Sequence, residues 1–306
     1  MRELKLGVIG QTGQLARALT AMCPGRSIQP IALGRRELDL STDDAMINQA
    51  LSRFEGVDGI VNAAAYTAVD AAESDQDTAQ RVNADAVKLI AEYCKHKQIP
   101  LVHVSTDYVF NGKSDAPYKP DQKTEPLGVY GRTKLQGELN IKNCAPPHAI
   151  LRTSWVYDGV GKNFLTTMLR LAGDRDVVRV VNDQFGRPTY ANHLAEACLV
   201  AIEALVKDPQ KYTGTFHVSN AGEVVSWANF AQSIFEEAAA HLDHKMTVTG
   251  IPSSEYPSPA ARPAYSAMDI SAFETVFNHA MPEWTEGLTQ AFNEWVTKTK
   301  GDKCDT

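Results

Sequence analysis

The 306-residue sequence predicts an α/β protein in which a doubly wound parallel sheet is joined to a smaller C-terminal lobe. Two observations support this fold class. In the first half of the chain, short apolar segments alternate with longer segments of helical periodicity, which is the pattern of β-α-β units. In the second half, loops rich in Pro, Ser and Gly at 111–126 and 251–263 interrupt further helical patterns. Such irregularity is typical of a separate lobe beside the sheet.

Six short apolar segments are expected to be strands, and Pro30 weakens the second of them. The clearest helix has a continuous apolar stripe, and Ser41 or Thr42 is expected to cap the second helix. The expected strands are 4–9, 28–33, 59–63, 100–105, 149–153 and 177–181. The expected helices are 14–22, 43–54, 78–97 (the clearest), 130–143, 192–206, 227–241 and 284–299.

Composition excludes several classes of function. A net charge of −7 and a pI near 5.6 disfavour long-range attraction to nucleic acid or to an anionic membrane. No apolar run approaches the roughly 18 residues of a membrane span, and no apolar leader precedes the first strand. The five cysteines form no C-x-x-C pair, which fits a reducing compartment and gives no metal site. We therefore expect a soluble, cytoplasmic protein.

A glycine-rich turn follows the first expected strand and opens the first helix. Gly10 allows the tight turn, Gly13 lets the backbone approach a pyrophosphate, and Ala16 still permits close packing of helix and strand. Unsatisfied N–H groups at a helix start favour phosphate charge. The turn predicts a Rossmann-like site for a nicotinamide dinucleotide. Its expected contacts here are Gly10, Thr12, Gly13, Gln14 and Leu15.

The segment after the second strand indicates which dinucleotide is bound. NAD-binding proteins usually place an acid there for the ribose 2′-hydroxyl, whereas this chain has Gly34-Arg35-Arg36. A guanidinium suits a 2′-phosphate, so NADPH is favoured, or accepted beside NADH. The alternative is that both arginines form a solvated turn. Asp39 and Leu40 are candidates for the adenine edge, although Asp39 could simply cap a turn.

Tyr130 and Lys134 stand four residues apart, on one face of an expected helix. Reduction of a ketone needs a proton donor for the developing alkoxide, and a nearby cation makes a phenol more acidic. The spacing alone is weak evidence, because Tyr93 and Lys97 repeat it at the end of another helix. The context of Tyr130 is stronger, because Thr106 at a strand's carboxyl end offers a hydroxyl to the substrate carbonyl.

Several stretches are longer and more specific than these short motifs. They are Asn62-Ala63-Ala64-Ala65-Tyr66-Thr67-Ala68-Val69-Asp70, Ser105-Thr106-Asp107-Tyr108-Val109-Phe110, Arg152-Thr153-Ser154-Trp155-Val156-Tyr157, Asn182-Asp183-Gln184-Phe185-Gly186-Arg187-Pro188-Thr189 and Ala261-Arg262-Pro263. With the glycine turn and the Tyr–Lys pair, they resemble the dTDP-4-dehydrorhamnose reductases, a family of the extended short-chain dehydrogenase/reductase superfamily. The resemblance runs from about Leu6 to Trp295.

The resemblance implies NAD(P)H-dependent reduction of the C4 ketone of dTDP-4-dehydro-L-rhamnose, which supplies bacterial surface polysaccharide. It implies that Tyr130 donates the proton, that Lys134 lowers the pKa of that phenol and binds ribose, and that Thr106 positions the carbonyl. Asp107 contacts the sugar, Trp155 lies against the hexose, and Arg262 meets the diphosphate. The further implied contacts are Asn62, Ala63, Ala64 and Ala65 along the cofactor, and Thr67, Val69 and Asn163 along the substrate.

The resemblance also implies two domains. An NAD(P)-binding domain is expected at 1–155 and 176–219, with a substrate-binding lobe at 156–175 and 220–306. Some members form a dimer bridged by magnesium on acidic side chains, but here Ala18 and Asn192 stand near those positions. Neutral side chains are poor magnesium ligands, so we expect no metal and either a monomer or a homodimer. Another nucleotide-4-ketosugar reductase, an epimerase or a regulatory subunit on this fold remain alternatives.

Overall fold

The computed structural model describes residues 3–242 and 244–304, with side chains as far as Thr299. The last residues of the predicted lobe and the side chain of Cys304 therefore lie outside the described part. The centre of the protein is a six-stranded parallel sheet with the strand order β2-β1-β3-β4-β5-β10. The strands are β1 (Leu4–Ile9), β2 (Ile28–Leu33), β3 (Gly59–Asn62), β4 (Leu101–Thr106), β5 (His148–Thr153) and β10 (Gly214–His217). The predicted fold class is confirmed.

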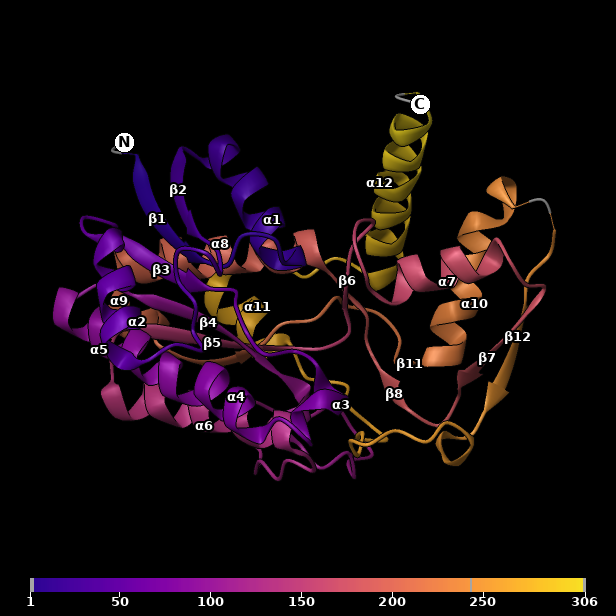
Figure 1. Ribbon diagram of the computed structural model, residues 1–306, viewed down its shortest axis with the longest axis horizontal. Helices are drawn as coiled ribbons and strands as arrows, with labels where there is room; N and C mark the ends of the chain where they lie inside the picture. The colour runs from indigo at the N-terminus through magenta and orange to yellow at the C-terminus, as the bar shows by residue number, and fades with distance from the viewer. Residues whose placement is uncertain (1–2, 243, 305–306) are drawn as a thin grey trace.

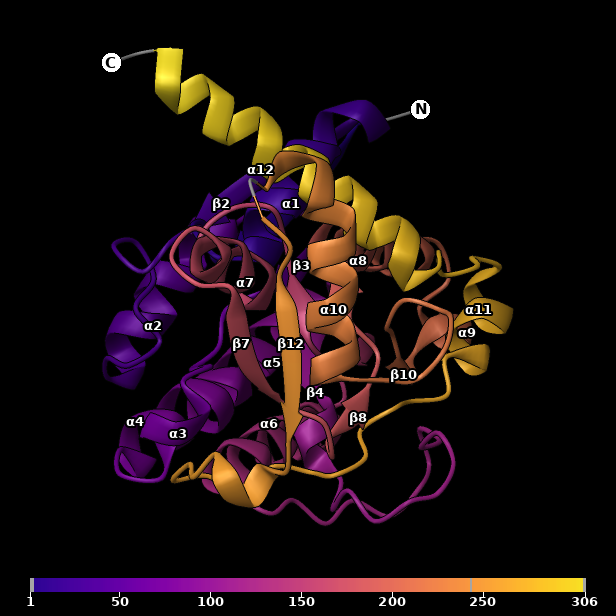
Figure 2. The ribbon, with the colours of Figure 1, turned by 90° about the vertical axis from the view of Figure 1, so that its right-hand side faces the viewer.

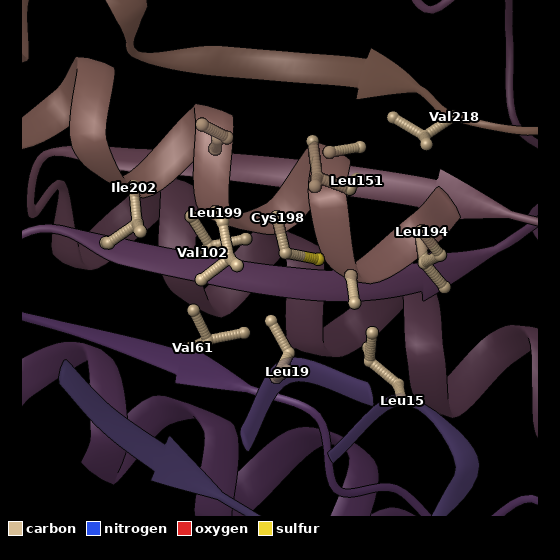
Figure 3. Close-up of a cluster of buried hydrophobic side chains, with 14 of the residues drawn as sticks. Leu15, Leu19, Val61, Val102, Leu151, Leu194, Cys198, Leu199, Ile202 and Val218 are labelled. Atoms are coloured by element: carbon tan, nitrogen blue, oxygen red, sulfur yellow. The ribbon is translucent and has the colours of Figure 1, made fainter. Parts of the chain in front are cut away.

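Helices cover both faces of this sheet (Figure 1). One face carries α1 (Gln14–Met22), α8 (Ala191–Lys207) and α11 (Ser271–Phe277). The other carries α2 (Asp44–Leu51), α5 (Ala86–Lys97) and α6 (Val129–Cys144). Figure 3 shows the first of these interfaces, where Leu19 of α1 and Cys198 of α8 lie over Val61 and Val102 of the sheet. Close packing of small and branched side chains there holds the glycine-rich turn firmly against the sheet edge.

The order of the strands creates a crevice at one edge. From β1 the chain turns to β2 on one side, and then returns to place β3 on the other side of β1. The connections that follow β1 and β3 therefore diverge at their carboxyl ends, and ligands of open α/β sheets bind at such a switch point. Gly10 directly follows β1 and Ala63 directly follows β3.

The smaller lobe packs beside the carboxyl edge of the sheet, on the right in Figure 1 and toward the viewer in Figure 2. Its core joins aromatic and aliphatic side chains of three helices and of a two-stranded parallel sheet. The helices are α7 (Phe164–Ala172), α10 (Trp227–Ala238) and α12 (Trp284–Cys304), and the strands are β7 (Val177–Val181) and β12 (Thr247–Ile251). Smaller elements join it to the sheet: β6 (Val156–Tyr157), β8 (Phe185–Gly186), β9 (Thr189–Tyr190) and β11 (Val225–Ser226).

Three expectations about the elements are wrong. β7 was expected among the central strands, but it pairs with β12 in the lobe, and its alternating exposure is that of a two-stranded sheet covered on one side. The sixth central strand is β10, whose short sequence Gly-Thr-Phe-His carries little apolar signal. The helix α2 is capped by Asp43, which accepts a hydrogen bond from the Met46 N–H at 2.9 Å, rather than by Ser41 or Thr42.

The long helix expected at 78–97 is interrupted. It begins as α4 (Gln76–Gln80), continues through a π-helical turn at Arg81–Asp85 and becomes α5. Further short helices are α3 (Val69–Ala72) and α9 (Pro209–Tyr212). Among the described residues, no helix has the length and apolar character needed to cross a bilayer.

Candidate active site

A cleft of about 1110 Å³ opens at the switch point of the sheet. It brings together residues that are far apart in the sequence, from the ends of β1, β3 and β4, from α6 and from the start of the smaller lobe. All but three of the predicted site residues line it. Those that do are Gly10, Thr12, Gly13, Gln14, Leu15, Arg35, Asp39, Leu40, Ala63, Ala64, Ala65, Thr67, Val69, Thr106, Asp107, Tyr130, Lys134 and Trp155.

The glycine-rich turn forms one end of the cleft. Gly10 has a φ of +117°, a conformation that side-chain-bearing residues rarely adopt. Gly13 is the N-cap residue of α1 and supplies no side-chain cap, so the first N–H groups of the helix are left without a bond from that position. Apart from the neighbouring backbone, nothing in the described protein lies within 4 Å of where a Cβ on Gly13 would sit. The turn is thus a cradle shaped for a group the protein does not supply, and a pyrophosphate fits it.

Gly13→Ala is therefore expected to weaken dinucleotide binding by about tenfold or more with an unchanged melting temperature. The new methyl group meets open space in the protein but occupies the approach to the helix start. Gly25→Ala is the matched control, because its Cβ also meets open space, in a turn outside the cleft. Fluorescence titration with NADPH and thermal unfolding measure both effects. Unchanged affinity in Gly13→Ala would contradict the cradle.

Two cations of the cleft were not predicted from the sequence. Arg17 on α1 pairs with Asp158, with 2.6 Å between Nη2 and Oδ2, and also bonds the Thr12 carbonyl. Lys162 follows in the same loop as Asp158 and lines the cleft. Arg17 directly follows Ala16 of the turn motif, and this position could have indicated that it lies near the cleft. Its pairing with Asp158 could not be predicted, because the two residues are 141 positions apart and no local pattern links them.

The edge of the cleft expected to hold the adenosine ribose carries a positive and a negative side chain, Arg35 and Asp39. Arg35 lines the cleft, with 81% of its side chain exposed, and its Nε donates to Asp39 Oδ2 at 3.1 Å. Partial burial raises the pKa of Asp39, but hydrogen bonds from Ser41 and Arg35 outweigh it and lower that pKa overall. Arg36 is exposed and does not line the cleft. Asp39, the candidate for the adenine edge, thus places an acid beside Arg35 in the cleft lining.

Thr106 and Asp107 stand at the carboxyl end of β4, and both are buried. The Thr106 hydroxyl donates to Asp107 Oδ1 at 3.0 Å and accepts from the Tyr108 N–H at 3.1 Å. It is also hydrogen-bonded to the phenol of Tyr130. Burial raises the pKa of Asp107 to about 6, although the nearby hydroxyls of Ser266 and Thr106 lower it in part. Within the described residues, Asp107 Oδ2 has no close hydrogen-bond partner, with the Ser266 hydroxyl nearby, so it can accept a hydrogen bond from a ligand hydroxyl.

Tyr130 and Lys134 lie one turn apart on α6 and both line the cleft. The Nζ of Lys134 donates to the Val104 carbonyl at 2.7 Å and lies 3.3 Å from Nε2 of His103. Burial raises the pKa of Tyr130 to about 12 and lowers that of Lys134 to about 8. Burial is the largest cause that acts on the pKa of this phenol, and Lys134 points at β4, so the lowering of that pKa by Lys134 stays a prediction.

The π-helical turn holds one wall of the cleft in place. Asn83 in this turn is buried, and its side chain accepts from the Tyr66 N–H at 2.9 Å and donates to the Tyr66 carbonyl at 3.1 Å. The same amide donates to Thr133 on α6 at 3.2 Å. One side chain thus ties the loop after β3 to the helix of Tyr130. π-Helical turns often occur at functional sites, and no local pattern in the sequence indicated this one.

Trp155 closes the other end of the cleft. Its backbone has a φ of +49°, which is strained for an aromatic residue and persists only where the surroundings enforce it. Its ring stacks on Trp227 of α10, with centroids 3.6 Å apart and planes at 10°. A Cβ on Gly186 would come within 2.8 Å of the same ring, so the ring is held on that side as well. The indole is a rigid apolar wall where the sheet meets the lobe.

Three predicted residues lie outside the cleft lining. Asn62 is buried beneath it, bonded to the Ala64 N–H and to His103. Asn163 caps α7 in a reciprocal capping box and donates to Asp158 at 2.8 Å, so its side chain is engaged within its own loop. Arg262 pairs with Asp70 at 2.8 Å and bonds the phenol of Tyr108, which does line the cleft.

The positions considered for a metal are engaged in packing. Ala18 is buried between α1 and α8, and the amide of Asn192 donates to the Tyr190 hydroxyl at 2.8 Å. No group of three or more His, Cys, Asp or Glu side chains suited to a metal ion is found in the part of the chain that the structure describes. The expectation of no metal stays a prediction.

Comparison with known proteins decides the family. Residues 4–297 match the family model described as the RmlD substrate binding domain. A dTDP-4-dehydrorhamnose reductase of Sinorhizobium fredii is 40% identical over 284 residues, covering 92% of this chain and 95% of the relative. That of Salmonella typhimurium is 43% identical, covering 79% and 81%. The chain belongs to the dTDP-4-dehydrorhamnose reductase family. The resemblance noted in the sequence is confirmed.

The structure agrees with this assignment. The crystal structure of the dTDP-4-dehydrorhamnose reductase of Bacillus anthracis, a complex with NADP, superposes with a TM-score of 0.87. It is 33% identical and covers 96% of this chain and 100% of the other. The present chain is thus an oxidoreductase of the dTDP-4-dehydrorhamnose reductase family that depends on a nicotinamide cofactor. The epimerase and regulatory-subunit alternatives are set aside.

Proposed function

We propose that this reductase transfers hydride from NADPH to the C4 ketone of dTDP-4-dehydro-L-rhamnose, with Tyr130 supplying the proton. The observation that carries the proposal is the meeting of Thr106, Tyr130 and Lys134 in the same cleft as the glycine cradle. A bound nicotinamide dinucleotide would supply the hydride. The residues suited to hold it are those of the cradle, with Arg35 and Asp39 at the ribose edge and Lys134 toward the nicotinamide end.

The protein's own groups account for the rest of the chemistry. A phenol with a pKa near 12 keeps its proton at neutral pH and releases it only to a strong base, such as an alkoxide forming at C4. The Thr106 hydroxyl, bonded to that phenol, is positioned to hold the same oxygen. Asp107 Oδ2 offers an acceptor to a sugar hydroxyl, and the Trp155 face matches the C–H surface of the hexose. We assign Arg262 to the support of Tyr108 and Asn163 to the cap of α7.

A spectrophotometric assay tests the proposed substrate. Oxidation of NADPH is measured with dTDP-4-dehydro-L-rhamnose and with UDP and GDP counterparts. We expect efficient turnover of the dTDP sugar, and the counterparts give the selectivity for the base. Absence of NADPH oxidation with every sugar would contradict the proposal.

The two lobes divide the chain somewhat differently from the expectation. We propose that the cofactor lobe comprises the six central strands with the helices on both faces, including α11, because Phe273 and Phe277 pack into its core. The substrate lobe then includes Val177–Val181, whose buried side chains pack with α7 and α10. Trp155, where β5 leads into the lobe, stays close to the predicted boundary.

Cofactor choice is predicted to depend on Arg35. Arg35→Ala should lower kcat/KM for NADPH by about tenfold or more and leave that for NADH nearly unchanged, because a charged hydrogen bond to the 2′-phosphate is lost. Arg36→Ala is the matched control, an exposed neighbour outside the cleft. Steady-state kinetics with both cofactors measure the effect. Equal losses with NADPH and NADH would show that Arg35 does not contact the 2′-phosphate.

A further inference from the structure

A chain of hydrogen-bonding groups runs beneath the cleft from the loop after β3 to Lys134. The Ala64 N–H donates to Asn62 Oδ1 at 3.1 Å, and Nδ2 of the same amide lies 3.1 Å from His103 Nδ1. His103 Nε2 lies 3.3 Å from Lys134 Nζ. Asn62, His103 and Lys134 are each at most 1% exposed. Their hydrogen bonds must therefore be made almost entirely with one another and with the backbone.

The donors and acceptors of this chain cannot all be matched if Lys134 is charged. A backbone N–H only donates, so Asn62 accepts through Oδ1 and must donate through Nδ2 to His103 Nδ1. A neutral imidazole has one donor and one acceptor, so Nε2 carries the proton and points it at Lys134. An ammonium group has only donors, whereas an uncharged amine has a lone pair to accept this bond.

We propose that His103 is a positioning residue for the reduction: it presents its Nε2–H to Lys134 and so weakens the hold of that amine on its proton. His103 does not line the cleft and acts only through Lys134. The inference deepens the proposed function, in which Lys134 stands beside the proton donor Tyr130. Each turnover consumes one proton from Tyr130, and an amine one turn away on the same helix that gives up its proton near neutral pH is a source from which that proton can be replaced.

Glu138 is the charged group that acts on Lys134. Glu138, one turn further along α6, favours the ammonium form of Lys134, but its carboxylate is already held by Arg152 of β5 and by the Ser105 hydroxyl. Tyr130 lies one turn before on the same helix. Burial outweighs the effect of Glu138 and lowers the pKa of Lys134 to about 8.

The imidazolium form of His103 is disfavoured as well. Burial is the main cause that lowers the pKa of His103 well below its usual value, and a positive charge on Lys134 or on His148 of β5 would act in the same direction. Asp107, at the end of the same strand, is bonded to Thr106 rather than to His103. His103 is therefore a neutral ring whose tautomer is set by Asn62.

The tautomer can be observed directly, without substrate. Long-range ¹H–¹⁵N spectra of the ¹⁵N-histidine-labelled protein distinguish bare from protonated ring nitrogens, and His103→Phe identifies the signal. We expect a bare Nδ1 and a protonated Nε2 that persist from neutral pH to about pH 5, well below the ordinary histidine pKa. A protonated Nδ1, or an imidazolium at neutral pH, would overturn the inference while leaving the proposed reductase activity untouched.

Asn62→Asp tests the coupling to Lys134. A carboxylate accepts from the Ala64 N–H and also from His103 Nδ1–H, which leaves Nε2 bare to accept from the Lys134 ammonium. We expect the tautomer to reverse and the alkaline limb of the kcat–pH profile to move up by about one unit or more, a tenfold change in proton affinity. If the new carboxylate acted on Lys134 only through its charge, the alkaline limb would move but the tautomer of His103 would stay the same.

His148→Gln is the matched control. It also removes a buried histidine, at the start of the neighbouring strand β5, whose ring bonds the Pro146 carbonyl and makes no hydrogen bond to Asn62, His103 or Lys134, so it should leave both the His103 tautomer and the alkaline limb in place. An unchanged tautomer in Asn62→Asp, or an unmoved limb, contradicts the role of His103. Correct tautomers in a protein that never oxidises NADPH would instead contradict the proposed function.

Discussion

Tyr130→Phe is expected to lower kcat by about 10²-fold or more, with little change in the affinity for NADPH. The substitution removes only the phenolic hydroxyl, which is bonded to Thr106 within the cleft. No other described side chain is placed as well to protonate an oxygen beside Thr106, because Asp107 is an acceptor above its pKa of about 6 and Lys134 points toward β4. The aromatic contact with Tyr108, with centroids 5.4 Å apart, survives in the variant.

The sequence provides an internal control for this experiment. Tyr93 repeats the same four-residue spacing with Lys97, but it lies on α5, and Lys97 pairs with Glu55 instead of reaching a cleft. Tyr93→Phe should leave kcat within about twofold, as expected for a substitution outside the site. Rapid-mixing and steady-state measurements of NADPH oxidation compare the two variants. Near-wild-type turnover in Tyr130→Phe would remove this phenol from the mechanism.

Glu138→Leu is expected to lower the free energy of unfolding by about 3–5 kcal/mol. Glu138 is 0% exposed and Arg152 is 2% exposed, and two hydrogen bonds of 2.9 and 2.7 Å join them. Removing the carboxylate leaves a buried guanidinium without its counterion, because the Pro120 carbonyl at 3.1 Å offsets only part of that charge. The same carboxylate holds Ser105, next to Thr106, so activity should fall as well.

A double variant distinguishes the ion pair from simple packing. Glu138→Leu with Arg152→Met removes both charges and should recover most of the lost stability, since apolar replacements of buried pairs are often nearly neutral. Glu92→Ala breaks the exposed pair of Lys88 and Glu92 on α5 and should cost less than about 1 kcal/mol. Urea unfolding followed by circular dichroism measures all three variants. A double variant as unstable as Glu138→Leu would mean that lost packing dominates.

The parts of the site that could be predicted are those encoded by neighbouring residues. The turn from Gly10 to Leu15, the Tyr130–Lys134 spacing and the hydroxyl at the end of β4 are local patterns, and the structure places all of them on one cleft. Their chemical roles remain proposals. The first five central strands were predictable for the same reason, because each is a short apolar run between helical segments.

The remainder depends on contacts between distant segments. Strand propensity located Val177–Val181, but it could not say that the partner strand begins 70 residues later at Thr247. The exposed Arg179 in the middle of this strand was an available sign of a sheet covered on one side. His103 lies inside an otherwise apolar run, so only the structure could show that it joins Asn62 to Lys134.

The central claim is that hydride reaches C4 of the sugar in the cleft that holds Tyr130. The most direct test is a reaction of the purified protein with dTDP-4-dehydro-L-rhamnose and NADPH deuterated at both C4 positions of the nicotinamide ring, with the product examined by NMR and mass spectrometry. We predict dTDP-L-rhamnose that carries one deuterium, located at C4 of the sugar. A product without deuterium, or with deuterium at another carbon, would contradict the account.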